Sequence, residues 1–211
     1  MKKILIVSVI LMALVLGSAF ANTSNVTVGT EVRYFPNEWS NIGEGIAFFG
    51  PDVSFSYIQD FAASSFAAYS SARLFYSPWV WQTGTKTIET KNESFFGVRG
   101  LFGVCLKPAE NASFKFVPAA GLYYELTDTV FTQATSGQNG YIIDHSVGVG
   151  ANIDMMIALS RNISFKIGLG SHYQLFESTR GDIDGTSFSE KMTWAPTIDS
   201  LDAQIGIGFS F

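Results

Sequence analysis

The chain has 211 residues, and its 13 lysines and arginines face 18 aspartates and glutamates, which gives a formal net charge of −5. This acidic balance argues against nucleic-acid binding, which requires clustered positive charge. Cys105 is the only cysteine, so the chain cannot close an internal disulfide.

The first 21 residues, MKKILIVSVILMALVLGSAFA, have the features of a secretory signal. Two lysines precede an apolar run from Ile4 to Gly17, and small residues occupy positions 19 and 21. The run is shorter than the roughly 20 residues that a membrane-spanning helix needs. We therefore expect cleavage after Ala21, leaving residues 22–211 as the mature chain.

Eight segments of the mature chain alternate between apolar and polar residues, the period of a β-strand. They are residues 25–35, 51–61, 66–77, 94–107, 114–126, 141–157, 163–176 and 201–211. At about 11 to 17 residues, they exceed the typical soluble strand of about 5–6 residues. This length favours strands that cross a membrane, which need about 9–11 residues in the hydrocarbon.

The connections between these segments alternate in length. Short connections cover 62–65, 108–113 and 158–162, whereas long ones cover 36–50, 78–93, 127–140 and 177–196. Short turns at one end and long loops at the other are typical of outer-membrane barrels. We therefore predict an all-β fold, an eight-stranded antiparallel up-and-down transmembrane β-barrel in which strand one closes against strand eight.

The polar face of these strands carries five acidic and five basic residues. They are Glu31, Arg33, Arg73, Arg99, Lys115, Glu125, Asp144, Asp154, Lys166 and Asp202. The lumen of an eight-stranded barrel holds little more than its own side chains. We predict that these charges pair in the interior as a structural plug, with a narrow polar conduit as the alternative.

The apolar face is predicted to meet lipid, interrupted by His145 and Pro118. Aromatic residues near the long connections suggest a girdle at the membrane interface: Trp39, Trp79, Trp81, Tyr124, Tyr141, Tyr173 and Trp194. A soluble lipocalin-like periplasmic barrel would instead bury this apolar face and expose the charged one. That fold, with a role as a binding protein, is the main alternative.

Enzymatic chemistry has little support in the sequence. The chain has two histidines, which excludes a site with several histidine ligands. Asp144, Ser146 and His172 could form a hydrolytic trio, but nothing in their spacing requires them to lie within hydrogen-bond reach. We therefore expect no enzyme activity, no metal and no cofactor.

Three stretches resemble small bacterial outer-membrane barrels, the group of the OmpA transmembrane domain, OmpX and OmpW. They are ANIDMMIALSRNISFKIGLG (151–170), FVPAAGLYYEL (116–126) and the terminal QIGIGFSF (204–211). The resemblance implies an outer-membrane location. It also implies that periplasmic chaperones and the barrel-assembly machinery recognise a C-terminal signal, here Ile205, Ile207, Phe209 and Phe211.

The same resemblance implies a class of function. We expect a structural or surface-interaction role, with a host molecule or small hydrophobic ligand contacted through the long loops. An OmpW-like narrow channel for small hydrophobic molecules is the alternative within this group.

Overall fold

The structure is a computed structural model that describes residues 23–36, 45–61, 64–83, 90–108, 113–133 and 137–211. The expected signal peptide and Trp39 lie outside these residues. The strands are β1 (Thr23–Pro36), β2 (Gly45–Asp60), β3 (Phe66–Ser77), β4 (Trp79–Thr83), β5 (Thr90–Leu106), β6 (Phe114–Gln133), β7 (Asn139–Ala158), β8 (Ile163–Ile183), β9 (Thr186–Ser189) and β10 (Thr193–Ser210). Within the described residues, no helix is long and apolar enough to cross a membrane.

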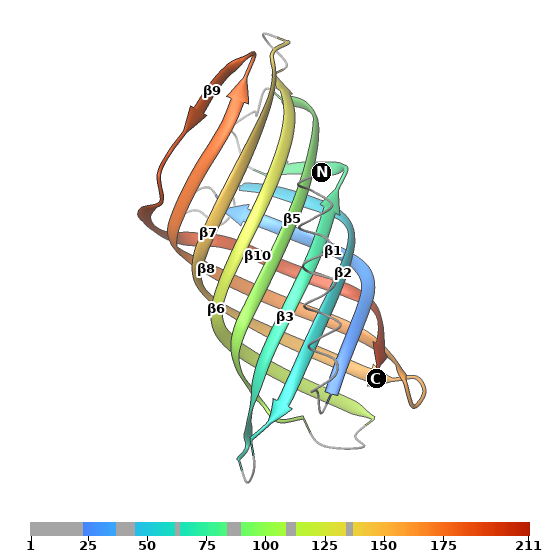
Figure 1. Ribbon diagram of the computed structural model, residues 1–211. Helices are drawn as coiled ribbons and strands as arrows, with labels where there is room; N and C mark the ends of the chain where they lie inside the picture. The colour runs from blue at the N-terminus through green and yellow to red at the C-terminus, as the bar shows by residue number, and fades with distance from the viewer. Residues whose placement is uncertain (1–22, 37–44, 62–63, 84–89, 109–112, 134–136) are drawn as a thin grey trace.

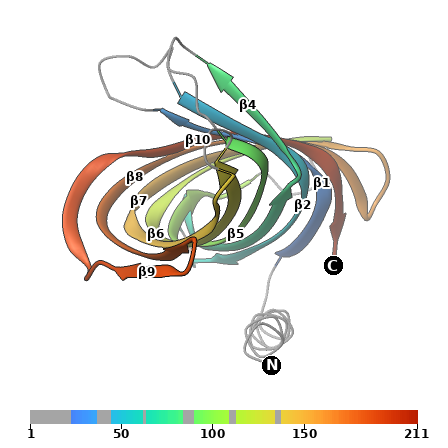
Figure 2. The same cartoon turned by 90° about the horizontal axis from the view of Figure 1, so that it is seen from above.

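Eight of these strands form a closed antiparallel ring (Figures 1 and 2). The order β1-β10-β8-β7-β6-β5-β3-β2 returns to β1, which pairs with both β10 and β2. The predicted eight-stranded up-and-down barrel is confirmed. Two short strands lie outside the ring, because β4 pairs with β2 and β9 pairs with β8.

The barrel is apolar outside and polar inside. Phe102 and Leu122 are 69% and 65% exposed on the outer face, whereas the neighbouring Arg99 and Glu125 are buried in the lumen. A belt of exposed apolar side chains around a charged interior suits a bilayer and not water. The lipocalin-like alternative, which requires the opposite arrangement, is wrong.

Several strands extend well beyond their predicted bounds at the end of the barrel that carries the long hairpins. β2 begins at Gly45 and not at residue 51, β6 continues to Gln133 and not to 126, and β10 begins at Thr193 and not at 201. β5 and β8 are also longer than predicted, and β4 and β9 lie within connections that were predicted to be loops. The β2 extension, GIAFFG, is apolar on both faces, and the β6 extension begins with Thr127, Asp128 and Thr129, which are polar on both faces. In either case the alternation that marks a half-apolar strand is lost although the ladder continues.

Glycines facing the lumen let neighbouring strands approach closely. Gly103 and Gly121 lie opposite one another on β5 and β6. A Cβ at Gly103 would lie 2.0 Å from the Ala120 carbonyl oxygen, and one at Gly121 would lie 2.1 Å from that of Phe102. Only glycine fits at this sharply curved part of the wall.

The wall is a closed ring only up to a certain height. The β1–β10 ladder ends at Tyr34↔Leu201, and the β3–β5 ladder ends at Ser77↔Phe95. Above these pairs, β1, β2 and β4 form one small sheet, and β5 to β10 continue as another (Figure 2). Pro78, which lacks a backbone N–H, marks the break, and the Ser77 hydroxyl lies within hydrogen-bond distance of the Phe49 and Trp79 carbonyl oxygens, at 2.6 and 2.5 Å.

Candidate functional site

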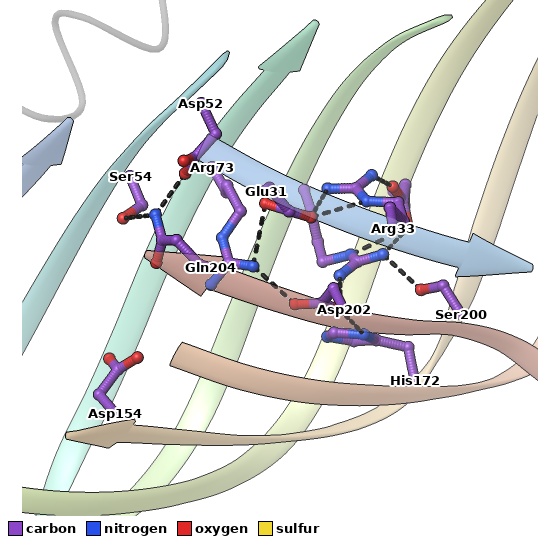
Figure 3. Close-up of polar contacts among 12 residues, drawn as sticks. Glu31, Arg33, Asp52, Ser54, Arg73, Asp154, His172, Ser200, Asp202 and Gln204 are labelled. Carbon is purple, nitrogen blue, oxygen red and sulfur yellow. Dashed lines mark hydrogen bonds and ion pairs between the residues drawn. The ribbon is translucent and has the colours of Figure 1, made fainter. Parts of the chain in front are cut away.

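Six buried charges form a closed ring across the middle of the lumen (Figure 3). β1 supplies Glu31 and Arg33, because residues two apart on a strand point to the same side. The other four come from β3, β5, β6 and β10, namely Arg73, Arg99, Glu125 and Asp202. The lumen face of five strands thus converges on one site.

Each member of this charge ring contacts two members of opposite sign. Arg33 pairs with Glu31 at 2.9 Å and with Glu125. Arg73 pairs with Glu31 at 3.2 Å and with Asp202 at 2.6 Å. Arg99 closes the ring through Asp202 at 2.8 Å and Glu125 at 2.6 Å. The three arginines and three carboxylates alternate, so the ring carries no net charge.

Further contacts hold the charge ring in place. His172 Nδ1 lies 3.1 Å from Asp202, and its imidazole meets the Tyr123 ring edge to face at a centroid distance of 5.0 Å. Arg99 also donates to the Ser200 hydroxyl at 2.6 Å. The Arg33 guanidinium lies 4.8 Å from the centroid of the Phe75 ring. These contacts orient the charges and add hydrogen bonds, the condition under which mutual attraction can offset the cost of removing the charges from water.

Apolar layers flank the charge ring. Phe48, Phe75 and Phe95 form an aromatic cluster towards the long-hairpin end, with Phe48 and Phe95 stacked at 4.4 Å. A second cluster towards the short turns includes Ile58, Ala67, Tyr69, Cys105, Val117 and Met156. Water that entered from either end would meet apolar side chains before reaching the charges.

A second polar group lies between the charge ring and the short turns. Lys166 pairs with Asp154 at 3.0 Å, and Tyr69 donates to the same carboxylate at 3.3 Å. Gln204 donates to Asp52 and, at 3.1 Å, to Ser54. In Figure 3, Asp154 lies apart from the charge ring, whereas Asp52 and Gln204 lie beside Arg73 of the ring.

Eight of the ten predicted interior charges are buried, but two are not. Lys115 and Asp144 face the lumen near its ends and are only partly buried. Lys115 lines a cavity of about 50 Å³ with Arg161 and Ser164 at the short-turn end. Both residues are on the predicted interior face, and they are only partly buried because the outermost residues of a strand still reach solvent at the mouth of the barrel.

Further polar residues lie in the interior beside the predicted charges. Asp52, His172 and Gln204 are buried in the lumen, and each lies on the polar face that the alternation of its strand indicates. Asp199 could not be found in this way, because a register shift between Ile198 and Ser200 lets its carboxylate accept from the Tyr123 hydroxyl at 2.8 Å.

The predicted aromatic residues lie on the outer surface where their side chains are described. Trp79, Trp194, Tyr124 and Tyr141 are between 43% and 62% exposed, and Tyr173 is partly exposed. Trp79 and Trp81 belong to β4 and not to a loop. The exposed C-terminal residues Ile205, Ile207, Phe209 and Phe211 also face outwards.

The considered hydrolytic trio is not assembled. His172 contacts Asp202, while the Ser146 hydroxyl donates to Gln174 at 3.0 Å. Among the described residues, no group of three or more His, Cys, Asp and Glu side chains could hold a metal ion.

The arrangement of the strands is found in known proteins. A major outer membrane protein of Thermus thermophilus superimposes with a TM-score of 0.51 at 13% identity, over 88% of this chain and 99% of that one. The fold is that of a small outer-membrane β-barrel. Neisserial surface protein A aligns at 10% identity and a TM-score of 0.48 over 89% of this chain and 95% of that one. Ail of Yersinia pestis aligns at 10% identity and a TM-score of 0.45, over 90% of this chain and 99% of that one.

No protein-family model matches the sequence of this barrel, and no curated protein matches it either. The likeness to the Thermus thermophilus protein is one of fold. Function must therefore be argued from the residues of the barrel itself.

Proposed function

We propose that the chain is an integral outer-membrane barrel with a closed lumen that serves a structural or surface-interaction role. Its short turns and C-terminal residue would face the periplasm, and its long hairpins the exterior. The charge ring is the single observation that carries this proposal. It joins charges from five of the eight ring strands at mid-height and leaves no charge of either sign unpaired within it.

The energetics of the charge ring oppose conduction. An ion or solute crossing the lumen would have to separate at least one buried pair, and removing one partner of a buried pair typically costs about 3–5 kcal/mol. The aromatic cluster above and the apolar cluster below add a dewetting barrier. A barrel of this kind is stable and closed, and offers its outer surfaces for contact.

The long hairpins supply such a surface. The extended part of β6, β7 and β8 bears an open groove of about 730 Å³, lined by Asp128, Val130, Tyr141, Ile143 and Asp182 among others. Aromatic and aliphatic side chains next to carboxylates suit contact with a host molecule or another extracellular ligand. This is where we place the interaction role.

Conductance in planar lipid bilayers tests the closed lumen. The wild-type barrel should give no reproducible conductance steps, whereas Arg99→Ala with Glu125→Ala, which opens the charge ring without changing net charge, should give measurable ones. Lys107→Ala, at an exposed rim pair with Asp60, serves as the matched control and should stay closed. Clear steps in the wild type would refute the proposal.

A lateral route for small hydrophobic molecules is a second candidate. The split of the wall above Ser77 and Phe95 leaves β4 and β5 without ladder pairing to each other, next to the aromatic cluster. Such molecules could pass from the exterior into the bilayer without crossing the charge ring. Uptake of a fluorescent alkane by barrel-containing liposomes, unchanged when a cysteine pair cross-links β4 to β5, would count against this route.

Assembly is a separate part of the proposal. We infer that periplasmic chaperones and the barrel-assembly machinery recognise the C-terminal strand, in which Ile205, Ile207 and Phe209 alternate with the lumen-facing Gln204 and two glycines. The exposed Phe211 backbone is fixed by an N–H bond of 3.0 Å to the Ser24 carbonyl on β1. The signal residue thus lies at the seam where the barrel closes.

A further inference from the structure

We propose that the outer face of β6, β7 and β8 carries a binding site for one phosphorylated lipid of the outer leaflet. The phosphate would lie at Arg180, His145 and Tyr124, and an acyl chain in the apolar groove on the periplasmic side of them. This inference rests on the proposed membrane role and deepens it by naming a lipid partner.

The head-group half of the site is a polar cluster on a face that otherwise meets hydrocarbon. The Tyr124 hydroxyl and His145 Nδ1 form a hydrogen bond of 2.6 Å across neighbouring strands. On β8, Arg180 lies opposite Ile143 of β7, which is two positions from His145. Arg180 and His145 therefore share the outer face of neighbouring strands.

Arg180 is an exposed cation on an outer face that also carries two carboxylates, Asp128 and Asp182. None of the described carboxylates forms an ion pair with it within 4.0 Å. The Ser178 position, directly opposite His145 in the ladder, adds a hydroxyl to the same patch. A guanidinium fork flanked by hydroxyl and imidazole donors matches the oxygens of a phosphate group.

The acyl half of the site is a groove of about 720 Å³ on the same strands. Its floor is a row of small residues in register across three strands, Ala120, Ala151 and Ser171. Phe102 and Leu122, the most exposed apolar residues of this face, form part of its border. Small residues between large ones leave a channel that one hydrocarbon chain can fill.

The two halves are spaced as in a lipid molecule. His145 and Ala151 are six positions apart on β7, roughly 20 Å along the strand. With the strand tilted by about 35–45°, the head-group cluster lies roughly 15 Å nearer the exterior than the groove floor. Tyr124 and Ala120 show the same order on β6. A phosphate at the interface and a chain in the hydrocarbon would therefore occupy both halves at once.

A lipid fits this site better than soluble phosphate. The groove faces outwards in the apolar belt, where the bilayer supplies acyl chains at high local concentration. The exposed Tyr124 on the same outer face has an amphipathic ring that prefers the head-group region. Charge complementarity at one end and an apolar channel at the other both select a phosphate-bearing lipid.

Native mass spectrometry of the purified barrel, released from detergent micelles, tests this site. The probes are phosphatidic acid and a diacylglycerol with the same acyl chains. One phosphatidic acid should bind at least tenfold more tightly than diacylglycerol, since each factor of ten needs only one charge-assisted contact. Arg180→Gln should remove this preference, and Ala151→Leu, which fills the groove, should weaken binding of both lipids.

Arg161→Gln is the matched control, because Arg161 lies in the short turn at the opposite end of the barrel. It should bind phosphatidic acid as the wild type does. Equal binding of both probes by the wild type, or equal losses in the Arg180 and Arg161 variants, would overturn the proposal. Heat-modifiable gel migration reports folding of each variant, and recovery of the wild type in lipid nanodiscs tests the membrane role separately, so the two failures are distinguishable.

Discussion

Opening the charge ring at one residue should destabilise the barrel strongly. Arg99→Met leaves Glu125 with Arg33 alone and Asp202 with Arg73 and His172, and it leaves the buried interior with one uncompensated negative charge. Breaking a buried pair in this way typically costs about 3–5 kcal/mol. The side chains of Arg99 and Glu125 are only 4% and 1% exposed, so solvent cannot screen the loss.

Removing an adjacent pair should cost much less than the two single changes together. Arg99→Met with Glu125→Met leaves the chain Arg33–Glu31–Arg73–Asp202, which is still neutral and still alternates in sign. We expect a coupling free energy of about 2–3 kcal/mol between the two sites, the upper range for residues in one network. The charge ring, and not the individual arginine, is then the stabilising unit.

Urea unfolding in detergent micelles, followed by tryptophan fluorescence, measures these free energies. Lys107→Met, at a partly exposed rim pair, is the control and should cost less than about 1 kcal/mol. An Arg99→Met midpoint equal to that of the wild type would refute the closed charge ring. Strict additivity of the two single changes would also refute it, because independent charges would then account for the stability.

Three more residues give predictions of their own. Gly121→Ala should cost about 1–3 kcal/mol in urea unfolding, because its Cβ would lie 2.1 Å from a backbone oxygen, whereas Gly100→Ala, with its nearest neighbour atom at 3.7 Å, should cost under about 1 kcal/mol. Cys105, 2% exposed inside the lumen, should resist maleimide labelling until the barrel unfolds, and rapid labelling in the folded state would show an open short-turn end. Deleting Phe211, 80% exposed, should lower the amount of barrel in the outer membrane while refolding into micelles stays unchanged, and normal membrane levels would contradict its role as an assembly signal.

The sequence predicted the barrel well where one face of a strand meets lipid and the other meets the lumen. β3 has the bounds predicted for it, Phe66–Ser77, although its Ala- and Ser-rich sequence alternates only weakly and Ala67, Tyr69 and Phe75 are apolar on the lumen side. The alternation fails beyond Leu126 on β6, where Thr127, Asp128 and Thr129 are polar on both faces. Backbone pairing continues there without a sequence period to report it.

The alternation of side chains along each strand predicted which charges face the lumen but not which of them form ion pairs. Glu31 and Arg33 share a face because they are two residues apart, and this could be read directly from the sequence. Arg33 and Glu125 are 92 positions apart in sequence, and their contact depends on how β1 and β6 face each other across the closed barrel. The register of the intervening ladders and the curvature of the wall fix that distance, and neither can be predicted from the sequence of a single strand.

The bulges and the split wall were also beyond prediction from periodicity. A shift of one residue inverts the faces of a strand. Asp199 is two residues before Leu201, so regular alternation would turn it towards lipid, but the shift lets it accept a hydrogen bond from the Tyr123 hydroxyl. Pro78, which cannot donate to a ladder, lies at the interruption. Beyond this proline the chain pairs with β2 in place of β5, and that choice depends on the competition between two neighbouring strand edges.

The charge ring and the split wall lie at different heights in the barrel and serve different purposes. A wall that opens above Tyr34↔Leu201 and Ser77↔Phe95 gives up ladder hydrogen bonds, which a barrel normally keeps because exposed edges are costly in a bilayer. The split therefore belongs above the hydrocarbon, where water can satisfy the free edges. Closure below it must come from side chains, and the neutral ring of three arginines and three carboxylates supplies it at the level where the strands still form an unbroken cylinder. The upper sheets are then free to vary in shape for recognition without opening the membrane to solutes.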